Sequence, residues 1–216
     1  MEILKIVITS LYVSLTATFI ASFFALVFGM FFLTKQFKLK DLFIKLFDSF
    51  TAMPPVLMGL LVFLLLSKNG PLGKYNLLFT PFAMILAQTL LVFPIIFTLM
   101  VKQIDKNALR IQKTCYMLGG RYKDFLTLIL KECKNEIMTA VTSGFSRAIS
   151  EVGAVMMVGG NIKGYTRVMT TFIALETSKG NFKGAVLVGV ILLCISFIVN
   201  AILYNLKGRE PNEYLY

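Results

Sequence analysis

The chain has 216 residues, of which 57% are hydrophobic, and a mean hydropathy of +0.78; soluble proteins are about 45–50% apolar, so we predict a membrane protein. Its net charge of +11 would suit nucleic acid, but basic loops set the topology of membrane proteins, and we expect a lipid membrane and no nucleic acid as its partner. Three cysteines without the spacing of metal ligands, and the absence of histidine, argue against a metal site.

Five apolar segments, taken in chain order, predict five transmembrane helices. They cover residues 6–33, 49–66, 75–101, 137–158 and 185–206. A span needs about 20 apolar residues, and a bilayer leaves only helices or closed barrels as spanning structures. The alternation that marks barrel strands is missing. We therefore expect an all-α membrane protein with a single transmembrane domain over residues 1–216 and a core at about 11–206.

The second apolar segment has Pro54 and Pro55 near its start. Proline lacks a backbone donor and is tolerated in a helix mainly in the first turn. The pair therefore marks either the start of a helix or a kink at a gate. In the third segment, Gln88 is a polar spot that we expect to hydrogen-bond to a neighbouring helix.

Residues 102–136 form the longest polar segment of the chain. Apolar residues recur there at helical spacing up to Leu118, the pair Gly119-Gly120 interrupts the pattern, and a second helical pattern follows. We expect two short helices joined at the double glycine. Such a pair is either a docking knob or an ordinary amphipathic pair at the membrane surface.

Arg147 and Glu151 lie inside the fourth apolar segment, four residues apart and on one face of the predicted helix. A charge at membrane depth costs roughly 2.5–3.5 kcal/mol on insertion scales, so such residues usually pair or line a path. Gly159, Gly160 and Asn161 then break the segment. The pattern predicts a place where something crosses the membrane or where a helix moves.

The distribution of Lys and Arg predicts the orientation in the membrane. These residues gather after the first segment, in residues 102–134 and after the last segment, and basic connections lie preferentially in the cytoplasm. This rule places residues 102–136 and the C-terminus in the cytoplasm and the N-terminus outside.

Several stretches of the sequence match a known family. Residues 53–59 together with 69–73, and residues 145–162, resemble the second helix and the fourth helix with its exit in the membrane subunit of type I ABC importers for oxyanions, the molybdate, sulfate and tungstate group. Residues 155–168, Thr170-Thr171 and residues 174–180 are most similar to tungstate permeases. The resemblance covers roughly residues 11–206.

The segment around the double glycine is similar to the cytoplasmic loop of these permeases, whose pattern is E-A-A-x3-G-x9-I-x-L-P. Gly119 and Ile129 match the glycine and the isoleucine of the pattern. The positions that differ are Lys113, Thr114 and Cys115, in place of the Glu and the two Ala, and Lys131 and Glu132, in place of the Leu-Pro.

The resemblance implies an ABC type I permease that works as a homodimer with two ATP-binding cassette subunits and an extracytoplasmic oxyanion-binding protein. It would lie in the bacterial or archaeal cytoplasmic membrane and import its oxyanion by alternating access, with residues 102–136 as the coupling loop. The sequence has no G-x4-G-K-[ST] phosphate loop. We therefore expect a transport subunit that is not an enzyme and binds no cofactor, with ATP used by the partner ATPase.

Two sets of candidate site residues follow. The ATPase-coupling set consists of Lys113, Thr114, Cys115, Gly119, Gly120 and Ile129. The translocation path or gate is assigned to Pro54, Pro55, Arg147, Glu151, Gly153, Gly159, Gly160, Asn161 and Thr166.

The charged residues near this path have two interpretations each. Arg147 and Glu151 form a structural lock, which we favour, or the free donors of Arg147 help to guide the anion. Lys163 and Arg167 raise the anion concentration at the mouth or, as we favour, face solvent.

Other functions are weighed against the favoured tungstate importer. Molybdate or sulfate is the alternative cargo, because the preference for tungstate depends on residues 146–180 only. An ATP-independent secondary carrier often has paired inverted repeats, and none is visible. An intramembrane enzyme needs clustered acids, an activated nucleophile or metal ligands, whereas Glu151 is the one acid inside the apolar segments.

Overall fold

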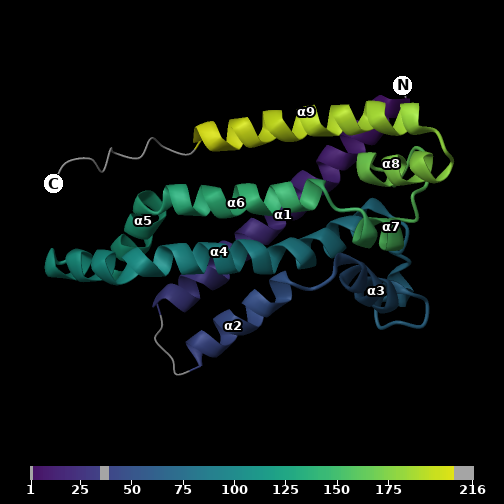
Figure 1. Ribbon diagram of the computed structural model, residues 1–216. Helices are drawn as coiled ribbons and strands as arrows, with labels where there is room; N and C mark the ends of the chain where they lie inside the picture. The colour runs from purple at the N-terminus through teal and green to yellow at the C-terminus, as the bar shows by residue number, and fades with distance from the viewer. Residues whose placement is uncertain (1, 35–38, 207–216) are drawn as a thin grey trace.

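The computed structural model describes residues 2–34 and 39–206, and the secondary structure of this part of the chain is helical (Figure 1). In chain order the elements are α1 (Glu2–Thr34), α2 (Lys40–Thr51), α3 (Pro55–Leu66), the 3-10 turn η1 (Gly73–Tyr75), α4 (Pro81–Met117), α5 (Tyr122–Glu132), α6 (Lys134–Ile149), α7 (Gly153–Gly159), α8 (Met169–Ser178) and α9 (Phe182–Leu206).

Three of the helices are long and apolar enough to cross a membrane. The spanning segments are Glu2–Leu33 in α1, Pro81–Asp105 in α4 and Phe182–Asn205 in α9. They correspond to the first, third and fifth predicted spans and confirm an all-α membrane protein. α1 packs along α4, and α9 packs against α6 and α8 on the other side of the molecule.

The second predicted span is not one helix. α2 and α3 meet at an angle of 99°, and Pro55 occupies the first turn of α3, so the prolines mark a helix start. The 12 residues of α3 span about 18 Å at 1.5 Å per residue, which is less than the roughly 30 Å of a hydrocarbon core. The bent pair can add at most a fourth span.

The fourth predicted span is also divided. α6 ends at Ile149 and α7 begins at Gly153, so a single continuous helix over residues 137–158 is wrong. The reason is tertiary packing, because α7 lies against α3. A Cβ atom added at Gly59 of α3 would come within 2.7 Å of the Ala154 Cα atom in α7. Small residues allow helices in membranes to approach this closely.

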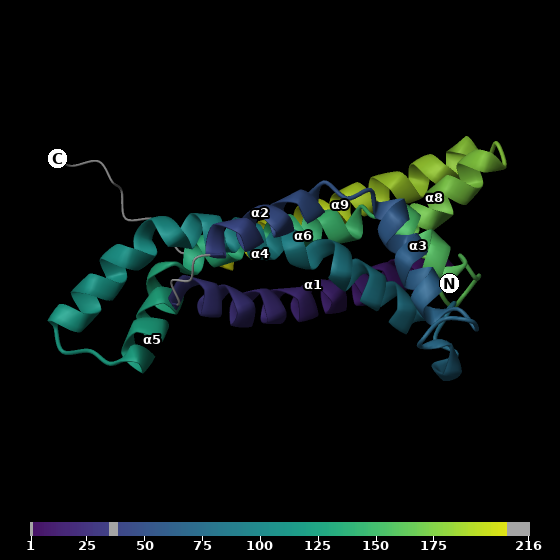
Figure 2. The ribbon, with the colours of Figure 1, turned by 90° about the horizontal axis from the view of Figure 1, so that it is seen from below.

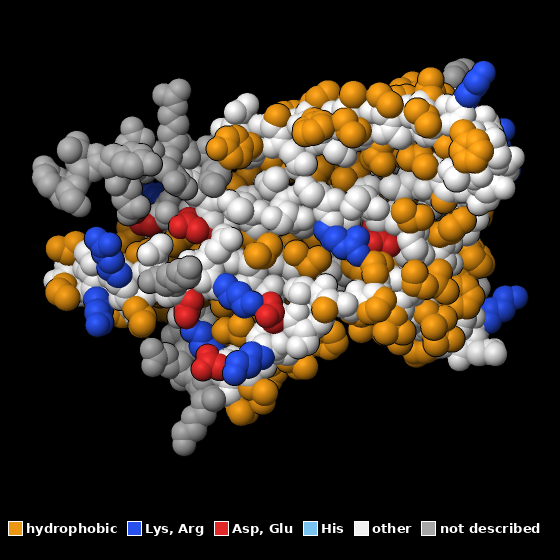
Figure 3. Space-filling model, viewed as in Figure 1, with side chains coloured by type: hydrophobic (Ala, Val, Ile, Leu, Met, Phe, Trp, Pro, Cys, Tyr) orange, Lys and Arg blue, Asp and Glu red, His pale blue; other side chains and the backbone are white. Residues whose placement is uncertain are grey.

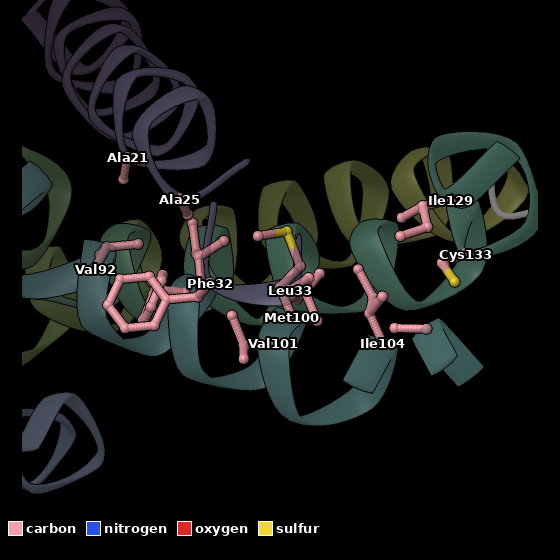
Figure 4. Packing of buried hydrophobic residues seen from close by; sticks show 14 of the residues in the cluster. Ala21, Ala25, Phe32, Leu33, Val92, Met100, Val101, Ile104, Ile129 and Cys133 are labelled. Atoms are coloured by element: carbon pink, nitrogen blue, oxygen red, sulfur yellow. The ribbon is translucent and has the colours of Figure 1, made fainter. Parts of the chain in front are cut away.

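The largest buried cluster fills the space between α1, α4, α5 and α6 (Figure 4). Ala21 and Ala25 of α1 have no exposed surface, and their small side chains let α1 lie close to α4. Phe32 and Phe97 contact edge to face, with their ring centroids 5.3 Å apart. The cluster continues to Ile129 and Cys133, so the core extends beyond the spanning segment of α4.

α4 and α5 form a hairpin that projects from one end of the molecule (Figure 2). α4 runs without a break from Pro81 to Met117, so the first of the two short helices expected in residues 102–136 is the continuation of the third spanning helix. The start of α1, α3, α7, α8 and the start of α9 gather at the opposite end (Figure 1). The hairpin is therefore rigidly connected to a membrane-spanning helix.

Candidate functional site

The double glycine closes α4 in a Schellman motif. The Gly120 amide donates to the Cys115 carbonyl at 2.9 Å, and the Gly119 amide donates to the Tyr116 carbonyl at 3.1 Å, which is the hydrogen-bond pattern of this motif. Gly119 has a φ of 76°, a left-handed conformation that glycine adopts without strain. The pair is thus required by the turn itself.

The other side of the turn is fixed as firmly. The Arg121 amide donates to the Asp124 carboxylate at 2.7 Å and satisfies a donor at the start of α5. Phe125 and Ile129 of α5 have no exposed surface and pack into the main core. The hairpin is therefore anchored on both sides of its tip.

The tip itself is apolar and exposed. Met117 is 81% exposed and Leu118 is 83% exposed. Leu118 continues the helical spacing of apolar residues in the sequence, but α4 ends at Met117, so the helix does not hold this side chain on its buried face. In the sequence, the signal for this exposed tip is a pair of large apolar residues directly before the double glycine.

The predicted coupling residues divide into two groups. Lys113 and Thr114 are exposed on α4, whereas Cys115 and Ile129 are buried in the core. A hollow of about 570 Å³ opens between α4 and α5, and its lining includes Asn107, Arg110, Thr114, Leu128 and Glu132. The hairpin thus presents an apolar tip beside a concave side that is lined by both polar and apolar residues.

The cysteine at the base of the hairpin is unreactive in character. Cys133 is buried, and its burial, with the nearby carboxylates of Glu136 and Glu132, raises its pKa to about 11. Its thiolate, the nucleophilic form, is scarcely populated at neutral pH.

The structure brings Arg147 and Glu151 together where α6 gives way to α7. An Arg147 guanidinium nitrogen lies 2.7 Å from the Glu151 carboxylate. The second oxygen of that carboxylate accepts from the Ala154 amide at 3.1 Å, in the first turn of α7, and the Glu151 carbonyl accepts from the Thr170 hydroxyl of α8 at 2.8 Å. Glu151 therefore ties three helices together.

The surroundings of this pair are closely packed. Gln88 of α4 donates to the Ala148 carbonyl at 3.0 Å, so its predicted role as a contact to a neighbouring helix is confirmed. A Cβ atom at Gly153 would lie 2.7 Å from the side chain of Val56, the residue that follows Pro55. The break between α6 and α7 is therefore held from α3, α4 and α8.

The glycine-rich segment after α7 is a closed turn. Gly160 and Asn161 have positive φ values of 69° and 50°. The buried Thr166 hydroxyl donates to the Gly159 carbonyl and accepts from the Ile162 amide at 2.9 Å. These groups, predicted to contact a passing solute, have hydrogen-bond partners within the turn.

Arg167 does not simply face solvent, which corrects our preferred interpretation. Its guanidinium donates to both the side-chain and backbone oxygens of Asn161 at 3.2 Å and lies 3.7 Å from the Glu2 carboxylate. The Lys163 ammonium lies 3.0 Å from the same carboxylate, but its side chain is 68% exposed. The first turn of α1 is thus tethered to this loop.

No family model matches the chain. Among curated proteins it is 45% identical, over 95% of this chain and 90% of the relative, to the tungstate uptake system permease protein of Peptoclostridium acidaminophilum. It is 35% identical, over 98% of this chain and 93% of the relative, to a probable anion ABC transporter permease protein of Haloferax volcanii. A tungstate uptake system permease protein of Campylobacter jejuni is 39% identical over 80% of this chain and 72% of the relative. The chain therefore belongs to the family of ABC transporter permeases that these relatives represent.

Proposed function

We propose that the chain is the membrane-spanning permease subunit of an ATP-driven importer for tungstate. The observation that carries this proposal is the 45% identity to a tungstate uptake permease over 95% of the chain. A second tungstate uptake permease shows 39% identity. Both relatives are named for the same cargo, which favours tungstate over molybdate and sulfate.

The hairpin supports a separate ATPase as a partner. Its exposed Met117 and Leu118 form an apolar contact point of the kind that anchors protein interfaces. The basic character of this end favours its placement in the cytoplasm, where ATP is available. The opposite end, with the first turn of α1 and Lys163, would then face outward and receive the anion from a binding protein.

The continuity of α4 supports a mechanical link between the ATPase and the membrane. α4 has 37 residues, about 55 Å at 1.5 Å per residue, and it contacts α1, α6 and α7. A displacement of the hairpin would move these helices as a rigid body, which is one of the usual ways that domains change between states. Two copies of the chain, related by a twofold axis, would enclose the path between them.

The test is tungstate uptake into proteoliposomes that contain the permease with its ATPase, in the presence of the binding protein. We expect uptake that requires ATP and all three components, and tungstate at equal concentration to outcompete molybdate and sulfate. Uptake by the permease without the ATPase would instead identify a secondary carrier. Preferential uptake of molybdate or sulfate would retain the importer and reject the cargo.

A further inference from the structure

One face of α6 is polar although it lies between apolar surfaces. Figure 3 shows a white band between the orange surfaces over α9 and α3. The residues of α6 and its C-terminal cap that form one side of the helix by spacing are Thr139, Thr142, Ser143, Ser146, Arg147 and Ser150. We call this surface the α6 polar strip. The opposite side of α6, with Ala140, Gly144 and Ala148, is buried.

The hydroxyl groups of the strip can change partners. Thr142 donates to the Met138 carbonyl at 2.8 Å, and Ser143 donates to the Thr139 carbonyl at 2.9 Å. These carbonyls already belong to the helix, and a hydroxyl proton can rotate to another acceptor. Ser146 is the exception, because its hydroxyl donates to the side-chain oxygen of Asn200 in α9 at 3.1 Å. The other hydroxyls of the strip are satisfied within α6 when the strip is empty, and they can be offered in turn to a passing anion.

Arg147 is the cationic member of the strip. Its side chain is 33% exposed, whereas that of Glu151 is 3% exposed. Within the described chain, Arg147 makes one hydrogen bond, to Glu151, although a guanidinium has five N–H donors. Glu151, in contrast, uses both carboxylate oxygens and its backbone carbonyl. Glu151 is therefore a buried brace, whereas Arg147 is a partly exposed cation with N–H donors that bond to no other described residue.

We propose that Arg147 contacts the oxyanion as it passes along the α6 polar strip, and that Glu151 is the positioning residue that aims the guanidinium. This inference rests on the proposed transport function. A guanidinium recognises an oxyanion through paired N–H donors, and Glu151 fixes one edge of the fork. Because Glu151 offsets the positive charge, the contact is weak, as a transit site requires.

The test compares variants of the complete transporter in proteoliposomes, by tungstate uptake per ATP hydrolysed. In Arg147→Gln we expect this ratio to fall about tenfold or more, which is the effect of losing one charge-assisted hydrogen bond, while ATP hydrolysis stimulated by the binding protein continues. The matched control is Lys183→Gln, which removes an exposed cation at the start of α9 and should leave the ratio unchanged.

Arg147→Lys keeps the charge and its ion pair and therefore tests the contact even where Arg147→Gln does not assemble. We expect an uptake ratio between those of the wild type and Arg147→Gln, because an ammonium cannot form the paired contact. A wild-type ratio in either variant overturns the inference, and so does a parallel loss of uptake and ATP hydrolysis in assembled Arg147→Gln. If the wild-type transporter moves another oxyanion instead, only the tungstate proposal is rejected. The uptake of that other anion per ATP hydrolysed, measured in the same variants, then tests the role of Arg147.

Discussion

At the scale of single residues, Glu151 explains why a charge is retained among apolar helices. Its carboxylate bonds to Arg147 and to the first turn of α7, and its carbonyl bonds to α8. The negative charge also lies near the N-terminus of α7, where the first amides lack helical partners. A charge that would be costly alone is therefore balanced on two sides.

Glu151→Gln should lower the thermal stability of the purified permease. Expressed as free energies, this loss should exceed the change in the affinity for the anion. The glutamine oxygen can still accept from Ala154, but the ion pair is lost, and we expect a cost of roughly 1–3 kcal/mol because Arg147 is partly exposed. Thermal unfolding in detergent measures this loss, with the exposed Glu132→Gln as the control. Full stability and a normal ATPase-coupled uptake rate in Glu151→Gln would reject the role of a brace.

Cys133 should react slowly with maleimide and more quickly as the pH rises. With its pKa raised to about 11, about a hundredfold less thiolate is present at pH 8 than for a thiol with the ordinary value of 9.0. The measurement is the labelling rate in a chain with Cys115 and Cys194 replaced by alanine. The reference is Leu118→Cys in the same chain, with Cys133 also replaced, and equal rates at pH 8 would contradict the prediction.

Some contacts of single residues can be predicted from the sequence, and others cannot. The spacing of Arg147 and Glu151 was enough to predict their contact, because four residues bring two side chains together on a helix. The sequence could not show that Thr166 bonds within its own turn, since that depends on the conformations of the intervening residues. Helical spacing likewise could not show that Leu118 is exposed, because α4 ends one residue before it.

At the scale of elements, long apolar runs were predictable and breaks were not. α1, α4 and α9 each contain an uninterrupted apolar span, and length alone identifies them. The break between α6 and α7 lies in an apolar run and arises from the packing of α7 on α3, which local sequence does not encode. Pro54 and Pro55 did signal the bend before α3, but not its angle.

Leu118→Asp should weaken the association of the permease with its ATPase while leaving the fold intact. The side chain is 83% exposed, so a polar replacement should change stability by no more than about 0.5 kcal/mol, whereas a charge in an apolar contact is unfavourable. Co-purification of the two subunits measures the effect. Leu109→Asp, at another exposed leucine of α4, is the control, and equal recovery of the ATPase with both variants would contradict the docking role.

Gly120→Ala should destabilise the hairpin more than Gly119→Ala. A Cβ atom at Gly120 would lie 2.6 Å from the Cys115 sulfur, whereas at Gly119 it would meet nothing within 4 Å. Gly119→Ala should therefore cost only the backbone strain of a left-handed residue, about 1–2 kcal/mol. Thermal unfolding of the two variants gives the order, and the reverse order would show that the tip is not packed as described.

At the scale of the whole molecule, the ion pairs and helix ends define two faces. The first turn of α1 lies beside the loop after α7, as the contact between Glu2 and Lys163 requires. The hairpin tip lies at the far end of α4 (Figure 1). A molecule placed across a bilayer by its three spanning segments therefore presents these two ends to different compartments.

Single cysteines at the two ends should be labelled from opposite sides of the membrane. In a cysteine-free background, we expect Leu118→Cys to react with a membrane-impermeant maleimide only after the cytoplasmic side is opened. We expect Lys163→Cys, whose native side chain is 68% exposed, to react in intact cells. Labelling of both cysteines from one side would contradict the arrangement, and the reverse pattern would invert the proposed orientation.

The tether between Glu2 and the loop after α7 makes this end of the molecule responsive to electrolyte. The contacts of Glu2 with Lys163 and Arg167 are 3.0 Å and 3.7 Å long, and partly exposed ion pairs add little to stability. Mobile ions screen such pairs increasingly as their concentration rises, with a screening length of about 8 Å at 0.15 M and 3 Å at 1 M. At high salt the two ion pairs should therefore loosen, while the uncharged hydrogen bond from the Met169 amide to the Ser10 hydroxyl still holds α1 against α8. The strength with which the first turn of α1 holds this loop is thereby set by the surrounding medium as well as by the chain.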